Sequence, residues 1–359
     1  MQGRLDKKVT DILDQAYAGR SLEKKDCSHL LSFDEWSPEA YATRSAAATI
    51  VRGRNDDSAI ILGQIGLEMF PCPGNCGFCA FGKDHAVMPK SRITDEEFAA
   101  KLTDFCRDDD LYGLYLMCMH EYDLDFFLDK ARLAKKMIAG STRLLANVGD
   151  TEKEAFAAMK EAGITGAYHV SRLREGKATA LNPKARVKTM ENALDAGLQI
   201  FSCLEPVGPE HTVEEIVENM FVGIDLGCTQ HAVMRRVPVP GTPLARCGQI
   251  SNLRLGQMVA AVALATFSRP NMTYMGVHEP TEIGYVSGAN VVTAETGVNP
   301  RDHMAETSAN RGLDMDICRR MLLDCGFRHI RRGNEEKIPL DLDYVNGLNR
   351  NGGGLAHDN

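Results

Sequence analysis

Three cysteines in the first third of the chain have a spacing suited to iron–sulfur chemistry. Cys72, Cys76 and Cys79 form a C-x3-C-x2-C motif on a glycine-containing loop that follows an expected strand. Three neighbouring thiolates can each hold one iron of a cubane cluster, and the fourth iron then has no protein ligand. An iron with an open position can chelate a small molecule and pass an electron to it. The motif therefore predicts a reactive cluster.

A structural zinc site is the alternative interpretation, with His85 as the fourth ligand. Zinc sites usually pair two short ligand clusters that are separated by a longer stretch of chain. The sequence contains no second C-x2-C pair. The spacing therefore favours iron and sulfide over zinc.

With the aromatic residue Phe78 before its last cysteine, the loop resembles the motif of the radical S-adenosylmethionine (SAM) superfamily. The resemblance implies that Cys72, Cys76 and Cys79 hold a [4Fe-4S] cluster and that SAM binds its open iron. It also implies reductive cleavage of SAM to a 5′-deoxyadenosyl radical, which abstracts hydrogen from a substrate. In such enzymes the cofactor carries the difficult chemistry and the protein positions it.

Further segments, scattered over roughly residues 40 to 330, resemble the biotin synthase branch, which includes the [FeFe]-hydrogenase maturase and methylornithine synthase. They are V-P-G-T-P-L-A at 239–245 and S-G-A-N-V at 287–291. The resemblance implies that Arg186, and Arg172 as a second ligand, meet the SAM carboxylate. It also implies that the Glu121 carboxylate accepts hydrogen bonds from the SAM ammonium and that Gly208 and Glu210 lie near the adenine. Solvated surface positions remain the alternative for Glu121 and Arg172.

A second cluster is an open alternative. Cys118 falls on the first position of the auxiliary cluster of biotin synthase, but the third expected strand has no cysteine and Cys203 is displaced by two residues. A different auxiliary cluster would combine Cys27, Cys118 and Cys203, with nitrogen from His120 or His278. Buried apolar packing of Cys118 and Cys203 is the other interpretation.

Three residues near strand ends are candidates for substrate contact. His278 and Glu279 follow the seventh expected strand, where imidazole and carboxylate groups can bind a cationic or hydroxylated substrate or transfer a proton. The same pair would also suit the first turn of a helix. His169 ends the fourth expected strand. It either faces the interior of the barrel or is a core residue whose hydrogen bonds are made within the protein.

Strands and helices alternate from about residue 59 to about residue 330. Thr94 with Glu97, and Thr212 with Glu215, have the spacing of capping boxes that begin helices. This alternation predicts an α/β fold, a TIM-type (β/α)8 barrel whose strands converge on one mouth. We expect a helical extension at 1–55, the barrel at 56–335 and a tail at 336–359, disordered from residue 347. The strands are expected at 59–69, 112–118, 142–147, 166–169, 198–204, 231–237, 272–277 and 289–293.

The composition limits the partners. A net charge of −8 argues against sequence-independent binding of nucleic acid over a broad surface. The apolar runs are too short to span a membrane, and the N-terminus lacks the apolar core of a signal peptide, so we expect a cytoplasmic protein. A disulfide framework is not expected there. The scattered cysteines are expected to be mostly buried: Cys106, Cys228, Cys247, Cys318 and Cys325.

The resulting prediction is a radical SAM enzyme that acts on a small-molecule or carrier-bound substrate and receives electrons from a donor such as flavodoxin or ferredoxin. Sulfur insertion, as in biotin or lipoyl formation, is the preferred reaction because of Cys118 and Cys203. Carbon-skeleton rearrangement or metallocofactor assembly is the alternative, which Glu121 favours. A non-catalytic iron–sulfur or zinc protein is the alternative of another class.

Overall fold

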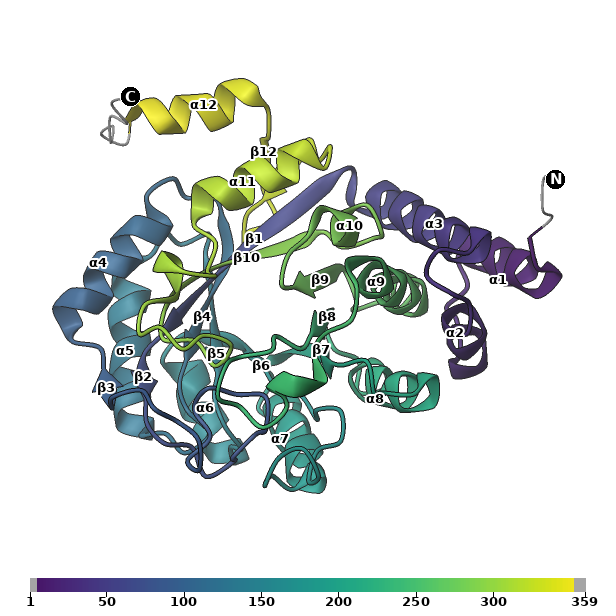
Figure 1. Ribbon diagram of the computed structural model, residues 1–359. Coiled ribbons are helices and arrows are strands. Elements are labelled where there is room, and N and C mark those ends of the chain that lie inside the picture. The colour runs from purple at the N-terminus through teal and green to yellow at the C-terminus, as the bar shows by residue number, and fades with distance from the viewer. Residues whose placement is uncertain (1–4, 352–359) are drawn as a thin grey trace, which may run out of the picture.

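The computed structural model describes residues 5–351 and contains a closed barrel of eight parallel strands (Figure 1). Each strand pairs with the next along the chain, and the last pairs with the first over seven residue pairs. The expected (β/α)8 fold is confirmed. The barrel strands are β1 (Ser58–Gly66), β4 (Leu111–Met117), β5 (Arg143–Asn147), β6 (Ile164–Tyr168), β7 (Gln199–Val207), β8 (Gln230–Arg235), β9 (Tyr274–His278) and β10 (Val291–Gly297).

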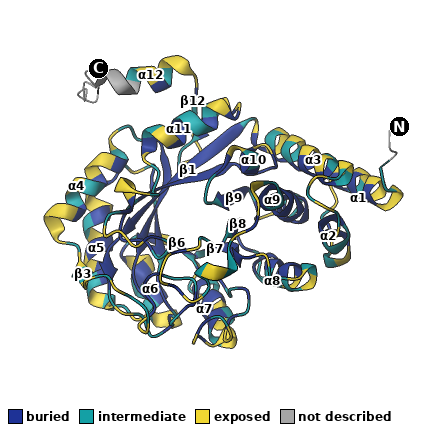
Figure 2. Cartoon of the chain, in the orientation of Figure 1, coloured by how far each residue is buried: buried dark blue, intermediate teal, exposed yellow. Residues whose placement is uncertain are grey.

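Helices surround the barrel and cover its outer face. Buried residues fill the strands and the inward faces of the helices, whereas exposed residues gather on the outward faces (Figure 2). Both expected capping boxes are present, at the starts of α4 and α8. In each box the threonine side chain accepts a hydrogen bond from the backbone amide of the glutamate three residues on, and the glutamate side chain accepts one from the backbone amide of the threonine. The surrounding helices are α4 (Asp95–Cys106), α5 (Leu124–Met137), α6 (Lys153–Glu161), α7 (Pro183–Asp195), α8 (Val213–Asp225), α9 (Asn252–Thr266), α10 (Glu282–Tyr285) and α11 (Met315–Asp324).

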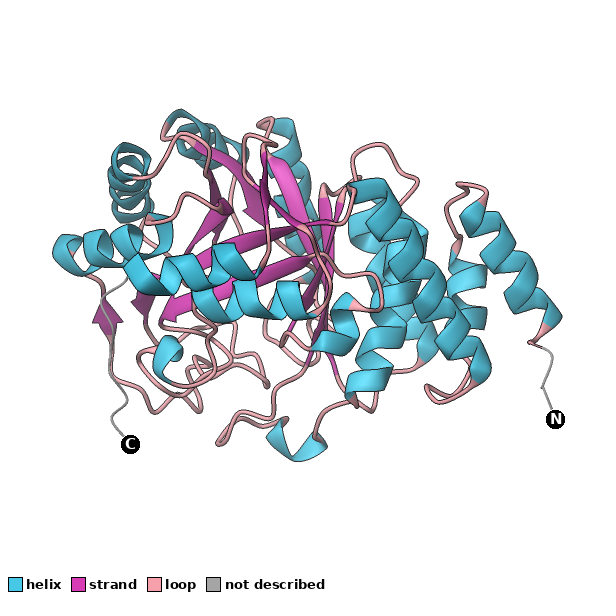
Figure 3. Cartoon of the chain, turned by 90° about the horizontal axis from the view of Figure 1, so that it is seen from above, coloured by secondary structure: helices cyan, strands magenta, loops and turns pink. Residues whose placement is uncertain are grey.

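The N-terminal segment forms three helices outside the barrel, α1 (Lys7–Tyr17), α2 (Lys24–Leu31) and α3 (Pro38–Asn55). They lie to one side of the barrel (Figure 3), where α3 packs on α9 and α2 packs on α8 and α9. The helix α9 is buried on nearly all sides as a result, which explains its long apolar run. No helix within residues 5–351 is long and apolar enough to cross a bilayer.

The C-terminal segment, which we expected to be a tail, forms two strands and a helix within the described residues. β11 (His329–Arg331) adds in parallel to the start of β1, and β12 (Lys337–Pro339) pairs antiparallel with β11. The helix α12 (Leu342–Asn351) follows, so residues 347–351, which we expected to be disordered, are helical. The rest of that expectation, residues 352–359, lies outside the described part of the chain.

The turn between β11 and β12 closes the N-terminal end of the barrel. Glu335 of this turn accepts hydrogen bonds from the hydroxyl groups of Tyr112 (3.1 Å) and Tyr274 (3.0 Å), which lie at the N-terminal ends of β4 and β9. Arg143 donates a further bond of 2.7 Å to the same carboxylate. The opposite, C-terminal end therefore remains as the mouth of the barrel.

Nearly all of the scattered cysteines pack as apolar residues. All eleven thiols are free, and Cys228, Cys318 and Cys325 are buried as expected. Cys106 and Cys247 are half-buried. The loop that carries Cys72, Cys76 and Cys79 lies between the two strands of a small sheet, β2 (Glu68–Met69) and β3 (Ser91–Arg92).

A buried ion pair ties α11 to the barrel. Arg319 donates to both carboxylate oxygens of Asp110, at 2.7 and 3.0 Å, and both side chains are almost fully buried. Replacing Arg319 with leucine leaves that carboxylate buried without its cation, so we expect a loss of about 3 kcal/mol in the free energy of unfolding. Denaturant titration measures the loss. Arg320→Leu is the matched control, because Arg320 bonds only the side chain of Asn346, and an equal loss in both variants would contradict the expectation.

Candidate active site

The three-cysteine loop lies between β2 and β3 and covers part of the barrel mouth. Its backbone folds on itself, since the Cys72 amide donates to the Phe81 carbonyl (2.7 Å) and the Cys79 amide to the Cys76 carbonyl (3.0 Å). Gly77 joins it to two other loops of the mouth. Its amide donates to the carbonyl of Ala178 (2.9 Å), and its carbonyl accepts from the amide of Leu244 (2.7 Å).

Two glycines of the loop pack closely against leucine side chains. A Cβ on Gly77 would lie 3.2 Å from Leu244, and one on Gly74 would lie 3.1 Å from Leu181. Both distances are tight for carbon atoms, so a side chain at either position would need its leucine neighbour to shift by a few tenths of an ångström.

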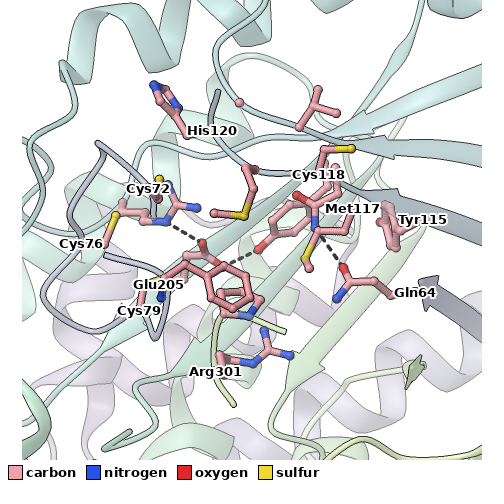
Figure 4. A pocket seen from close by; sticks show the side chains of 18 of the residues that line it. Gln64, Cys72, Cys76, Cys79, Tyr115, Met117, Cys118, His120, Glu205 and Arg301 are labelled. Carbon is pink, nitrogen blue, oxygen red and sulfur yellow. Dashed lines mark hydrogen bonds and ion pairs between the residues drawn. The ribbon is translucent and has the colours of Figure 1, made fainter. Parts of the chain in front are cut away.

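A cavity opens under this loop and extends into the barrel, and polar and apolar side chains line it. Figure 4 shows the three cysteines on one side of the cavity and Gln64 and Tyr115 on the other. The sequence-predicted residues that line it are Cys72, Cys76, Phe78, Cys79, Cys118, His120, Arg172, Arg186 and His278.

The three thiols suit a cluster ligand set. Burial raises the pKa of Cys76 to about 11 and that of Cys79 still further, while the positive charge of Arg172 opposes both shifts. Within residues 5–351, no three His, Cys, Asp or Glu side chains converge on a single metal ion. A cubane cluster has a different requirement, because each cysteine binds a separate iron. Three thiols on one short loop beside a cationic group fit that requirement.

His85, the fourth ligand of the zinc alternative, makes another contact. Its Nε2 atom lies 2.7 Å from the carbonyl oxygen of Cys79, and its ring lies against Gly82. The imidazole is therefore held by the backbone of the loop. It is absent from the lining of the cavity that the three cysteines share.

Two arginines lie close enough to Cys76 for their charges to act on its thiol. Arg186, from the first turn of α7, donates through Nε to the carbonyl of Val170 (3.0 Å) and through Nη1 to Asp150 (2.9 Å). Arg172, from the loop after β6, has its Nε 3.2 Å from a carboxylate oxygen of Glu205. Both guanidinium groups line the cavity and oppose the rise in the pKa of the Cys76 thiol that burial causes.

Three other residues expected at SAM do not line this cavity. Glu121 is exposed in the turn after β4 and does not line the cavity. Glu210 borders a separate hollow that Phe78 also lines, and Gly208 lines neither this hollow nor the cavity. There the Glu210 carboxylate forms a two-point ion pair with Arg236, which lowers its pKa to about 2. A Cβ on Gly208 would lie 2.4 Å from the Arg236 guanidinium, so this glycine is needed for the pair to form.

The cysteines proposed for a second cluster are not brought together. Cys27 is buried between α2 and α9, where its thiol lies 3.9 Å from the Ala261 carbonyl, because the N-terminal helices pack outside the barrel and do not cover the mouth. Cys118 lines the cavity beside Glu68, whereas Cys203 packs under Val170 on the inner face of β7. The expectation that Cys27 joins the other two is therefore wrong.

Of the three residues expected to contact the substrate, one lines the cavity and two do not. His278 lines the cavity, and burial together with Arg301 lowers its pKa to about 4. His169 is buried outside the cavity, 3.2 Å from Asp150, as a core residue. Glu279 lies behind the cavity wall, where it contacts Arg301 at 2.8 Å.

Most residues of the cavity floor were not among the sequence predictions. The Asn147 amide donates to Gln64 (2.9 Å), whose own amide donates to Glu295 (3.1 Å). The Tyr168 hydroxyl donates to Glu205. Strand alternation would have identified the side chains that point into the barrel from expected strands. Nothing in the sequence signals Arg301, which reaches the cavity from the loop after β10. The missed residues are Gln64, Tyr115, Asn147, Tyr168, Glu205, Glu295 and Arg301.

Comparison with known proteins supports the same interpretation. No family model matches the chain. In sequence, it is 25% identical over 268 residues to biotin synthase from Clostridium beijerinckii, covering 69% of this chain and 79% of the relative. In fold, it is similar to methylornithine synthase, with a TM-score of 0.75 and 17% identity over 88% of this chain and 96% of that one. The [FeFe]-hydrogenase maturase HydG from Carboxydothermus hydrogenoformans has a TM-score of 0.73 and 15% identity, over 89% and 79%.

The barrel, the three-cysteine loop at its mouth and the relative in sequence together define a radical SAM enzyme, the class that uses a [4Fe-4S] cluster and SAM. Within this class, the chain is similar to the biotin synthase-like branch. Such an enzyme acts on a small substrate and needs a reductant.

The environment of Gly208 gives a test of the role of Glu210. Alanine at position 208 places a Cβ against the Arg236 guanidinium, so we expect the ion pair with Glu210 to break and stability to fall by about 1–3 kcal/mol. Thermal and denaturant unfolding measure the loss. An unchanged unfolding midpoint in Gly208→Ala would contradict the expectation.

Proposed function

We propose that the chain abstracts a hydrogen atom from a small molecule held inside its barrel, with Cys72, Cys76 and Cys79 as the cluster ligands. The observation that carries this proposal is one continuous cavity with the three thiols at its mouth and paired polar side chains at its floor. When bound, the cluster and SAM supply an electron and a carbon radical. The protein residues then have to position SAM, hold the substrate and exclude water.

Arg172 and Arg186 are proposed as the ligands of the SAM carboxylate. Their positive charges act on the Cys76 thiol, and guanidinium binds carboxylate with good geometry. Asp150 and Glu205 keep these two side chains in place, at 2.9 and 3.2 Å respectively. Because both arginines already have carboxylate partners, they are held in position before the cofactor binds.

Tyr168 and Glu205 are proposed to connect the SAM part of the cavity to its floor. Glu205 is buried, accepts from the Tyr168 hydroxyl and pairs with Arg172. The Tyr168 ring lies edge-on to Tyr115 and to His278, with centroid separations of 6.0 Å in both cases. Through this series of contacts, Arg172 is connected to the part of the cavity where a substrate would lie.

A reaction that needs no second cluster is the better supported of the two expected routes, namely carbon-skeleton rearrangement or metallocofactor assembly. The deep cavity is lined by Gln64, Asn147 and Glu295 in one hydrogen-bonded series, and these groups suit substrate binding. Cys118 retains some support for sulfur insertion, because it alone of the three auxiliary candidates lines the cavity. A flavodoxin or ferredoxin remains the predicted electron donor.

The cluster assignment is tested by single cysteine replacements. We expect Cys72→Ala, Cys76→Ala and Cys79→Ala each to lose most of the iron and all formation of 5′-deoxyadenosine with dithionite as reductant, because the cubane needs all three thiolates. Iron analysis and chromatography of the products measure both quantities. Cys247→Ala is the control, since Cys247 is half-buried and does not line the cavity. Full activity in any of the three variants would contradict the assignment.

The role of Arg186 is tested by Arg186→Lys, which keeps the charge opposite Asp150 but removes the guanidinium geometry. We expect the KM for SAM to rise roughly tenfold to a hundredfold, with a smaller effect on kcat, because a charged hydrogen bond is lost. Lys184→Arg on the exposed side of the same helix is the control. An unchanged KM in a folded variant would remove Arg186 from the SAM site.

A further inference from the structure

Two arginines and two glutamates form one ion-paired group at the wall of the cavity. Arg301 lies between Glu279 (2.8 Å) and Glu295 (2.7 Å). Arg311 contacts the same two carboxylates, at 2.7 and 3.0 Å. Arg301, which Figure 4 shows among the cavity residues, and Glu295 line the cavity, whereas Arg311 and Glu279 do not. A ligand in the cavity therefore meets this group at Arg301 and Glu295.

The Glu295 carboxylate has little capacity left for a ligand. Its Oε1 atom accepts hydrogen bonds from Gln64 (3.1 Å), Asn299 (2.9 Å) and Arg301 (2.7 Å). Its Oε2 atom accepts from Arg311 (3.0 Å), which does not line the cavity. A carboxylate offers about four lone-pair sites, so an ammonium group on a ligand would have to displace one of these donors.

The Arg301 guanidinium, in contrast, has donors without a good acceptor. Among the residues described, its Nη1 atom donates only to the thioether sulfur of Met234 (3.1 Å), which also lines the cavity. A thioether is a weak acceptor. The Nε atom lies 2.8 Å from Glu279 but is buried without a hydrogen bond. An oxygen atom in place of the sulfur would therefore gain a charge-assisted hydrogen bond from Arg301.

His278 offers a second donor close to Arg301. Within the described part of the chain, its Nε2 atom is buried without a hydrogen bond, and the residue lines the cavity. Burial and the nearby Arg301 charge lower the pKa of His278 to about 4, so the ring is neutral near pH 7. A neutral imidazole whose Nε2 atom carries the proton donates one hydrogen bond. Arg301 and His278 can thus each supply one N–H group to the same part of the cavity.

We infer that the cavity binds a carboxylate group of its substrate at Nη1 of Arg301 and Nε2 of His278. The inference rests on the proposed function, because it takes this cavity as the substrate site and assigns Arg172 and Arg186 to SAM. The ion pairs of Arg301 are compatible with such a ligand, since Arg172 and Arg186 also have acidic partners. An ammonium group at this position would meet a like charge, and a neutral amide would form a weaker bond with the guanidinium.

The test uses three probes that share a five-carbon chain and differ in their end group: pentanoate, pentanamide and pentylamine. Binding to the anaerobic, cluster-loaded enzyme with SAM is measured near pH 7 by saturation-transfer NMR titration. We expect pentanoate to bind at least about tenfold more tightly than either of the other probes, because only its bond with Arg301 joins opposite charges. Equal or tighter binding of pentanamide or pentylamine, or no binding of pentanoate, would overturn the inference.

A matched pair of variants tests the role of Arg301. Arg301→Gln and Arg311→Gln each remove one guanidinium group from the same two carboxylates, but only Arg301 lines the cavity. We expect Arg301→Gln to bind pentanoate no more tightly than pentanamide and Arg311→Gln to keep the preference. An equal loss in both variants would show a structural effect of the ion-paired group and refute the inference.

Two further variants keep the test decisive if Arg301→Gln does not fold. Arg301→Lys retains the positive charge between the two carboxylates but lacks the guanidinium fork, so pentanoate should bind severalfold more weakly. His278→Leu should weaken pentanoate about threefold to tenfold through the loss of one hydrogen bond. Unchanged binding of pentanoate in both variants would place the probe elsewhere and overturn the inference.

Failure of the proposed function is distinguishable from failure of this inference. Formation of 5′-deoxyadenosine from SAM is assayed in the same preparation without any probe. If SAM is cleaved while pentanamide or pentylamine binds as tightly as pentanoate, only the inference fails. If the preparation holds no cluster and cleaves no SAM, the proposed function fails, whatever the probes do.

Discussion

The pairing of β10 with β1 is the constraint on which the rest of the site depends. Seven consecutive residue pairs close the sheet into a barrel, and closure brings the C-terminal ends of all eight strands to one mouth. The cysteine loop leaves from β1 and β2, Arg172 follows β6, and Arg301 follows β10. Residues more than 200 positions apart in the chain share one cavity only because that last pairing forms.

Charge pairing then determines which side chains remain available for binding. The low-dielectric interior makes each unpaired charge costly, and the barrel accordingly places Glu205 against Arg172, and Arg301 between two carboxylates. These pairs hold the arginines of the cavity in place before any ligand binds.

Much of this architecture was predictable from sequence. Eight strands, two capping boxes and the cysteine loop have local signals, such as a threonine three residues before a glutamate or three thiols in a fixed spacing. Cys27 was misplaced because nothing local shows that its helix packs on α9 rather than over the mouth. Glu205 and Arg301 escaped notice for a related reason: their roles depend on partners brought from distant strands, and such contacts leave no pattern in the chain.

The most direct test of the central claim is electron paramagnetic resonance of the reduced, anaerobic protein with and without SAM, together with iron and sulfide analysis. The account predicts about four irons per chain and a cluster signal that changes when SAM is added, because SAM binds the iron that no cysteine holds. Zinc in place of iron, or a cluster signal that SAM leaves unaltered, would contradict it.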